Sequence, residues 1–174
     1  MWYVIWTLTG KENMLIGRIQ SELPDKLYRR CYTPVRMERQ KHNGELMDVE
    51  KILFPGYVFI DTDTPEEVEQ EIESLHGQTG LIGFLKNESV YLAVSPEECE
   101  IIGRLIGEEG VAGVSVGIIE NGILRVIDGP LKGFEQYITK VDRHRRKAYV
   151  AMPLFGEVRH FNLGLQVVEK DNKI

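Results

Sequence analysis

Hydrophobic residues recur at helical spacing in three segments of the first 106 residues. The positions are Ile16, Ile19 and Leu23, then Val68, Ile72 and Leu75, then Ile101, Leu105 and Ile106. Each segment follows a hydroxyl residue with a glutamate three positions later, a pattern in which both side chains bond free amides at a helix start. The pairs are Thr9 with Glu12, Thr64 with Glu67, and Ser95 with Glu98. We therefore predict three helices.

Strand-like runs lie between these helices. They comprise residues 2–8, a hairpin from 31–39 to 46–53 that turns at 42–44, and then residues 57–60 and 81–85. Together with the helices, they predict that residues 1–106 form an α+β sandwich, a mainly antiparallel sheet that carries helices.

The pattern changes after the third helix. The stretch GEEGVAGVSVGIIENG at residues 107–122 has five glycines in sixteen residues and no clear period, which is typical of a linker. Beyond it lie five short strand-like runs, at residues 123–127, 136–141, 148–154, 158–161 and 166–168. Because turn residues separate them, we predict a small closed β-barrel.

Composition narrows the class of protein. With 43% hydrophobic and 28% charged residues among 174, the chain is neither collagen-like, disordered nor a disulfide scaffold. It has no apolar run of the roughly 18 residues that span a membrane and opens without a signal-peptide pattern, so we expect a cytoplasmic protein. Cys31 and Cys99 are expected to be small buried residues, because no cysteine pair or cluster suggests a metal, a cofactor or a disulfide.

Catalytic motifs are absent from the sequence. It has no phosphate-binding glycine loop, zinc-protease helix or serine-hydrolase elbow, and its four histidines fall in separate elements. We therefore expect a binding protein and not an enzyme.

The net charge of −6 is unevenly distributed. It is +2 over residues 1–60, −11 over 61–117 and +3 over 118–174. Five glutamates of the second helix account for much of the acid and are expected to form a solvated face: Glu66, Glu67, Glu69, Glu71 and Glu73. Residues 143–147 instead place four fixed positive charges in five positions, which fits either a solvated loop or a nucleic-acid contact.

The first predicted strand is apolar on both faces. Trp2, Val4 and Trp6 alternate with Tyr3 and Ile5, and residues 57–60 repeat the pattern. Either helices cover both faces of the sheet, or one face is a docking surface for another protein, where Trp and Tyr often dominate the binding energy.

Three stretches together resemble the NusG family of transcription elongation factors. They are WYVIWTLTGKE at the start, LFPGYVFID at 53–61, and GILRVIDGPLKGF at 122–134 with its continuation to 170. The resemblance implies an NGN domain at residues 1–106, a linker at 107–121 and a KOW β-barrel at 122–170. The stretch from DRHRRKAYV to LQVVEK is most similar to a specialised branch, the LoaP processive antiterminators.

The resemblance also implies partners for the first domain. In the family an apolar sheet face binds the clamp helices of bacterial RNA polymerase, and the matching positions here are Trp6, Tyr57, Phe59 and Pro55. Another side faces non-template DNA, and the basic residues expected there are Arg18, Arg36, Arg39 and Lys41.

For the barrel, a LoaP-like KOW domain implies binding to an RNA hairpin in the nascent leader transcript. The expected RNA-binding residues are Lys132, Lys140, Arg143, His144, Arg145, Arg146, Lys147 and Arg159. The hypothesis is thus a monomeric elongation and antitermination factor without a cofactor or metal. Two alternatives stay open: a NusG-like factor whose KOW domain binds ribosomal protein S10 and Rho, and an RNA-processing KOW protein that never meets polymerase. The sequence departs from the family pattern at Gln136, a position where many KOW motifs have a glycine.

Overall fold

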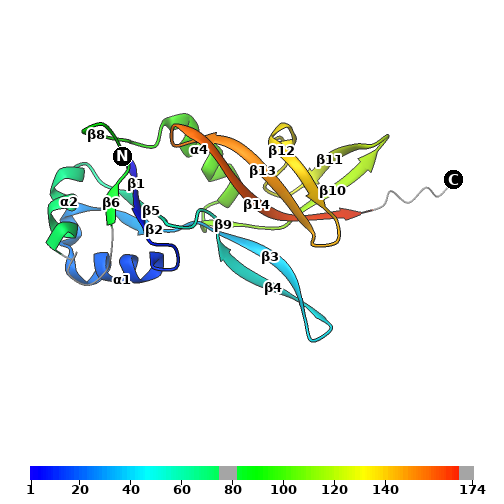
Figure 1. Cartoon of the computed structure of the whole chain (residues 1–174), viewed down its shortest axis with the longest axis horizontal. Coiled ribbons are helices and arrows are strands. Elements are labelled where there is room, and N and C mark those ends of the chain that lie inside the picture. Colours follow the sequence, from blue (N-terminus) through cyan, green and yellow to red (C-terminus); the bar gives the residue numbers. More distant parts are fainter. Residues whose placement is uncertain (75–81, 169–174) are drawn as a thin grey trace. The chain divides into compact units, whose positions relative to one another are not determined.

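The computed structural model describes residues 1–74 and 82–168, which form two compact units (Figure 1). The first unit contains Met1–Pro34 and Phe54–Glu100. The second contains Val35–Leu53 and the chain from Ile101 onward. The domain boundaries predicted from the sequence stay a prediction.

A four-stranded antiparallel sheet forms the first unit. Its strand order is β2 (Arg30–Tyr32), β5 (Tyr57–Asp61), β1 (Trp2–Thr7) and β6 (Ile82–Phe84). The other elements are α1 (Glu12–Glu22), the 3-10 turn η1 (Asp25–Leu27), α2 (Pro65–Ser74) and the pair β7 (Lys86–Asn87) with β8 (Val90–Tyr91). These confirm an α+β fold with a mainly antiparallel sheet.

The core of this unit lies on one face of the sheet. Tyr3 and Ile5 of β1 pack there with apolar residues of α1 and α2, including Ile19 and Ile72. Each fully buried side chain of this size stabilises the fold by about 1.5–3 kcal/mol. Trp6, paired with Tyr57, points to the opposite face.

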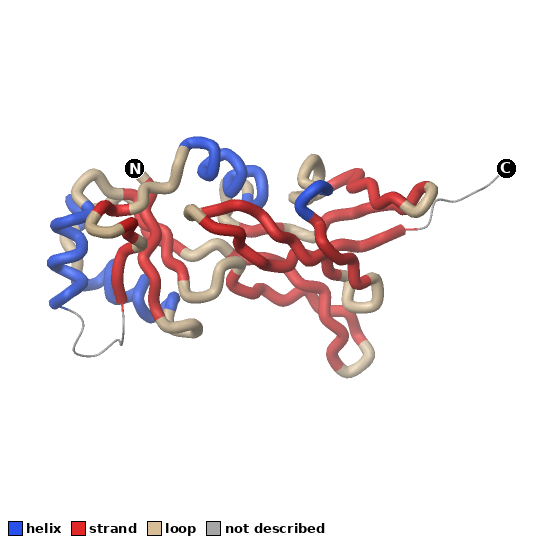
Figure 2. The backbone as a smooth tube through the Cα atoms, turned by 45° about the horizontal axis from the view of Figure 1, so that its top comes forward, coloured by secondary structure: helices blue, strands red, loops and turns tan. Residues whose placement is uncertain are grey.

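The second unit consists mostly of strands (Figure 2). The hairpin β3 (Val35–His42) and β4 (Glu45–Ile52) forms one sheet with β9 (Val111–Ala112). A five-stranded sheet has the order β11 (Ile123–Asp128), β10 (Ser115–Glu120), β14 (Glu157–Val168), β13 (Lys147–Leu154) and β12 (Ile138–Asp142). Helix α4 (Pro96–Ile106) crosses the division between the units. None of the helices in the described ranges is long and apolar enough to span a membrane.

The predicted linker contains strands, so the expectation of an unpatterned segment was wrong. Strand β10 pairs antiparallel with β11 and parallel with β14. Its inward positions are Ser115 and Gly117, and a Cβ on Gly117 would come within 3.0 Å of the Leu124 side chain. Small inward residues let the strands approach closely, but they conceal the alternation by which strands are recognised.

The predicted closed barrel is realised as a sheet whose edges, β11 and β12, share no ladder. The 3-10 turn η2 (Glu135–Tyr137) spans part of this gap, because the Glu135 carboxylate accepts the amides of Val126, at 3.1 Å, and Gly133, at 2.9 Å. Two predicted strands, at 158–161 and 166–168, form one continuous β14. Buried Met152, Leu154 and Leu163 fill the core.

The predicted helix start is confirmed at α4 but not at α1. At α4 the Ser95 Oγ accepts the Glu98 amide at 3.2 Å, and the Glu98 carboxylate accepts the Ser95 amide at 2.9 Å, as predicted. At α1 the prediction was wrong, because the helix starts at Glu12, where Lys11 is the cap. Helix α2 follows Thr64 directly. Leu75 and Leu81 lie outside the described residues.

Candidate protein and nucleic-acid interfaces

Aromatic rings form a layer on the sheet face opposite α1 and α2, which we call the aromatic face: Trp2, Trp6, Tyr32, Tyr57 and Phe59. Ring centroids lie 5.4 Å apart for Trp2 and Tyr32 and 5.9 Å apart for Tyr32 and Phe59. Such ring pairs add about 0.5–1.5 kcal/mol beyond burial. The layer is therefore a rigid apolar surface.

The four residues predicted to bind polymerase differ in exposure. Pro55 is exposed, Trp6 and Tyr57 are half-buried, and Phe59 is only 2% exposed. Phe59 packs on Phe54 as well as Tyr32, with ring centroids 6.1 Å apart for the former. In this structure, Phe59 supports the aromatic face from within, while Trp6 and Tyr57 lie at its surface.

A buried carboxylate, which sequence reasoning assigned to a helix cap, fixes the loop before β5. Glu12 is 1% exposed and accepts the amides of Gly56, at 2.6 Å, and Gly10, at 2.8 Å. Gly56 has a φ of +84°, and a Cβ there would approach the Thr7 carbonyl to 3.0 Å. This network holds Pro55 at the loop tip. The only signal in the sequence is an acid three residues after Thr9.

The basic turn, residues 143–147, joins β12 to β13 and is ordered by hydrogen bonds from its backbone amides. The Asp142 carboxylate accepts the Arg145 amide at 2.8 Å, and the Arg146 amide donates to the Arg143 carbonyl at 3.3 Å. The hydrogen bond from the Arg145 amide contributes most to lowering the pKa of Asp142, and nearby positive charges, including that of Lys140, lower it further. Arg146 has a φ of +55°, a left-handed conformation that costs a non-glycine residue about 1–2 kcal/mol. The turn thus holds an arginine where glycine is favoured.

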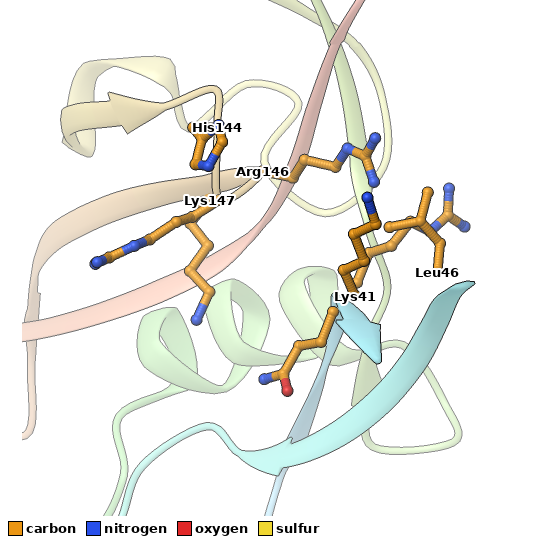
Figure 3. A pocket seen from close by; sticks show the side chains of 8 residues that line it. Lys41, Leu46, His144, Arg146 and Lys147 are labelled. Atoms are coloured by element: carbon orange, nitrogen blue, oxygen red, sulfur yellow. The ribbon is translucent and has the colours of Figure 1, made fainter. Parts of the chain in front are cut away.

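This turn faces the β3–β4 hairpin across an open groove of about 570 Å³. The lining residues are Arg39, Gln40, Lys41, Leu46 and residues 144–147. Figure 3 shows Arg146 extending from the turn and Lys41 from the hairpin toward the same space. We call this feature the basic groove. It brings together residues that the sequence interpretation assigned to two different nucleic acids.

A buried ion pair connects the walls of the basic groove. Lys147 Nζ lies 2.8 Å from Glu38 Oε2, and Glu38 is only 3% exposed. Arg36, at 3.0 Å, and Gln40, at 2.9 Å, also donate to Glu38. Burial by itself raises the pKa of Glu38, but the hydrogen bonds from Lys147, Gln40 and Arg36 outweigh it and lower that pKa. Sequence reasoning missed Glu38, whose only signal is a single acid in the basic run VRMERQKH.

Several predicted nucleic-acid residues are engaged within the protein. Arg18 lies on α1 in the first unit and pairs with Glu22 at 2.7 Å. Arg36 also donates to the Ile52 carbonyl at 2.6 Å, and Arg39 pairs with Asp48 at 2.9 Å. The four residues assigned to DNA therefore do not all belong to one unit. Their role in DNA binding stays a prediction.

Three of the predicted RNA-binding residues, Lys132, Lys140 and Arg159, do not line the basic groove. Arg159 pairs with Glu157 and stands opposite Met152, about 17 Å along β13 from Lys147. Lys140 lies over the Tyr149 ring, 5.6 Å from its centroid, and the Lys132 carbonyl accepts from Arg104. None of these three lines the groove. Their assignment to RNA also stays a prediction.

Three cations at the groove and turn have no acidic partner among the described residues. In residues 1–74 and 82–168, no carboxylate lies within 4.0 Å of the charged groups of Lys41, Arg143 or Arg146, whereas Arg145 reaches Asp142 at 4.0 Å. The same ranges hold no cluster of three His, Cys, Asp or Glu side chains that suits a metal ion. The groove is thus arranged to attract an anion through arginine and lysine side chains.

The two cysteines and the glutamates of α2 differ in how far they are buried. Cys31 is buried, as predicted, and burial raises the pKa of its thiol to about 12. Cys99 is only half-buried, against the prediction, because it lies at the start of α4. Of the five glutamates, Glu69 pairs with Lys86 at 2.6 Å and the others are exposed, which confirms a largely solvated face.

The fold and these surfaces define an α+β protein with an aromatic sheet face in one unit and a basic groove in the other. A family model described as transcription termination factor nusG matches residues 1–103, more than half of the chain. The chain therefore belongs to the NusG family of transcription termination and antitermination factors.

Individual relatives are similar to this chain over nearly its whole length. The transcription termination/antitermination protein NusG of Deinococcus radiodurans is 28% identical over 193 residues, covering 97% of this chain and 98% of that protein. The protein of the same name from Bacillus subtilis is 27% identical, with 97% of each chain covered. A solved structure described as the domain interaction in Thermotoga maritima NusG superposes with a TM-score of 0.59 at 22% identity, covering 94% of this chain and 92% of that one. That structural likeness concerns the fold alone.

Proposed function

We propose that this protein is a cytoplasmic transcription elongation and antitermination factor of the LoaP type. Its NGN domain binds the clamp helices of RNA polymerase, and its KOW domain binds an RNA hairpin in the leader of the transcript. Together these contacts promote readthrough of terminators in target operons. The observation that carries this proposal is the basic groove, in which free cations of the barrel turn and the hairpin converge.

The aromatic face supports the polymerase contact. Trp6 and Tyr57 pair across β1 and β5 and offer large rings of the kind that dominate protein interfaces, while buried Phe59 packs on Tyr32 in the same layer. Pro55 stands exposed on a loop fixed by Glu12. By holding a mobile clamp in one state, such a contact biases polymerase away from pausing through differential affinity.

The basic turn supports the RNA contact. Arg143, His144, Arg145 and Arg146 follow each other on a rigid turn, and the planar fork of arginine suits phosphate oxygens. Arg146 occupies this turn although its φ of +55° is costly for a residue other than glycine.

The domain boundaries are part of the proposal: NGN at residues 1–106, a connecting segment at 107–121 and KOW at 122–170. The family match to residues 1–103 supports the first boundary. A second candidate function is that of a NusG-like elongation factor whose KOW domain binds ribosomal protein S10 and Rho. The names of the relatives, which include termination as well as antitermination, favour it.

Transcription in vitro separates the two functions. RNA cross-linked to the full chain is recovered, and its sequence is placed upstream of a terminator on a template for purified RNA polymerase. We expect the protein to raise readthrough only when that RNA is present. Readthrough that is independent of the RNA favours the general factor, and readthrough that never changes rejects antitermination.

A variant tests the RNA contact directly. Replacing Arg143, Arg145 and Arg146 together with Ala removes up to three phosphate contacts, so the slope of log affinity against log salt is expected to fall by about 3. Binding isotherms at several salt concentrations measure that slope. A slope equal to the wild type contradicts a role for the turn.

A further inference from the structure

The basic groove joins two segments that are about 100 residues apart in sequence. Arg39 and Lys41 belong to the β3–β4 hairpin, which the family resemblance assigns to DNA. Residues 144–147 belong to the barrel turn, which we propose to bind RNA. Because both line one groove within the second unit, their ligands need not be different molecules.

The positive charges on both walls of the groove favour an anion that contacts both walls at once. Lys41 and Arg146 extend into it from opposite sides (Figure 3), and no carboxylate of the described chain lies within ion-pair distance of either. Like charges that converge without a counter-charge repel each other. A polyanion placed between them relieves that repulsion, whereas a ligand on one wall leaves it in place.

The lining indicates which part of a nucleic acid fits. Among the residues that the structure describes, the groove is lined by no aromatic side chain apart from the imidazole of His144, and by one large apolar residue, Leu46. Single-stranded bases are held mainly by stacking on aromatic rings, which this groove does not offer. Folded RNA is instead recognised by its backbone and shape, for which arginine and lysine are the suitable side chains.

Contacts behind the groove fix the distance between its walls. Lys147 reaches buried Glu38 at 2.8 Å, and Arg39 donates to Gln166 of β14 at 3.3 Å. Strand β14 also approaches the hairpin backbone directly, since a Cβ on Gly164 would lie 2.9 Å from the Met37 carbonyl oxygen. A groove whose walls are held in place binds without the cost of ordering them.

We propose that the basic groove is a single site for the sugar-phosphate backbone of a folded RNA, contacted by Lys41 of the hairpin and Arg146 of the turn together. This inference rests on the proposed RNA-binding function and extends it to the hairpin. It assigns Lys147 and Arg39 to holding the walls, and Lys41, Arg145 and Arg146 to the phosphates.

The test uses the full chain with a labelled RNA stem-loop and a DNA duplex of the same stem sequence, because backbone contacts do not depend on sequence. Two variants each remove one wall's free cation: Lys41→Ala and Arg146→Gly. Glycine accepts the φ of +55° at position 146, so the turn is expected to keep its conformation. The matched control is Lys51→Ala, an exposed lysine of the same hairpin outside the groove.

We expect each groove variant to weaken stem-loop binding by about tenfold, the loss of one hydrogen bond to a charged group. Each is also expected to reduce the salt slope by about 1, and Lys51→Ala to change neither. Thermal unfolding of every variant confirms that the fold is kept.

Each other outcome is decisive. If Arg146→Gly weakens RNA binding but Lys41→Ala behaves like the control, the turn alone binds RNA, so the shared groove is rejected and the proposed function stands. If Lys41→Ala weakens only duplex binding, the hairpin contacts DNA and the shared groove is again rejected. If neither these variants nor the triple arginine variant affects RNA binding, the groove and the turn are both rejected as the RNA site. If the wild-type chain itself does not bind the stem-loop, the RNA function is rejected.

Discussion

The aromatic face of the first unit and the basic groove of the second unit are built on opposite principles. The aromatic face is apolar, lies on a sheet that helices back from the other side, and carries half-buried rings. The groove is lined mainly by basic residues, whose positively charged ends converge between two walls. The net charge of −6 describes neither surface, because the acid lies mainly in residues 61–117. One surface suits a protein partner and the other a polyanion.

The largest effect we predict separates the two units by stability. Gly129→Ala forces a residue with a φ of +92° to carry a Cβ that would lie 2.5 Å from Ser115 Cα. Backbone strain and overpacking are expected to destabilise the second unit by about 3 kcal/mol or more. Hydrogen exchange on the full chain measures this as lost protection in β10 and β14, with β1 and β5 unchanged.

The matched control is Gly113→Ala, where an added Cβ meets no atom within 4 Å. Equal exchange in both variants would show that the contact between Gly129 and Ser115 does not hold the sheet together. Loss of protection in β1 as well would show that the two units unfold as one.

The next effect concerns the ion pair behind the groove. Lys147→Met removes the ammonium beside Glu38 and leaves a buried carboxylate with fewer partners. We expect a loss of about 3 kcal/mol in the stability of the second unit, typical of a broken buried pair. Urea unfolding measures it, with Lys51→Met as the control. Equal midpoints for the two variants would contradict a structural role for Lys147.

A smaller effect is expected at the aromatic face. Trp6→Ala removes a half-buried ring, and we expect polymerase affinity to fall by about 30-fold, equivalent to the roughly 2 kcal/mol of an interface hot spot. Affinity for stem-loop RNA is expected to stay unchanged. The control is Met14→Ala, an exposed apolar residue on α1. If RNA affinity falls equally, the variant has disturbed the fold and not one surface.

The smallest effect is a dependence of stability on pH. The pKa of Glu38 is lower in the folded protein than in the unfolded chain, so its stabilising contribution is present above about pH 4.3, the unfolded value. That contribution is lost as the pH falls through the folded pKa. Glu38→Gln removes this part of the acid dependence, which thermal unfolding between neutral and acidic pH measures. An identical pH profile would indicate that Glu38 is not ionised in the folded state.

The sequence predicted the parts of the fold whose periodicity involves large residues. Strand β1, with its alternating aromatics, and the cap at Ser95 and Glu98 lie where expected. Strand β10 was missed because its inward residues, Ser115 and Gly117, carry no hydrophobic signal. A pattern along the chain detects faces that bury large side chains and overlooks those that bury small ones.

The candidate sites were predictable only in part. The basic turn stands out in the sequence as a dense charge cluster, but its opposite wall lies about 100 residues away. Glu38 is one acid among basic neighbours, and nothing local shows that it is buried under Lys147. Similarly, Phe59 matches a family position, while its burial beneath Tyr32 follows only from tertiary packing. The sequence shows where charged residues cluster along the chain, but only the fold shows which residues they contact.

The pairing of Glu38 with Lys147 has a consequence for synthesis, because 109 positions separate the two residues. At translation rates of about 5–20 residues per second, the hairpin leaves the ribosome roughly 5–20 s before its partner strand exists. An isolated two-stranded hairpin is at best marginally stable in water. The charged side chains of β3 and β4 therefore keep a waiting segment soluble in the nascent chain before they serve the finished groove.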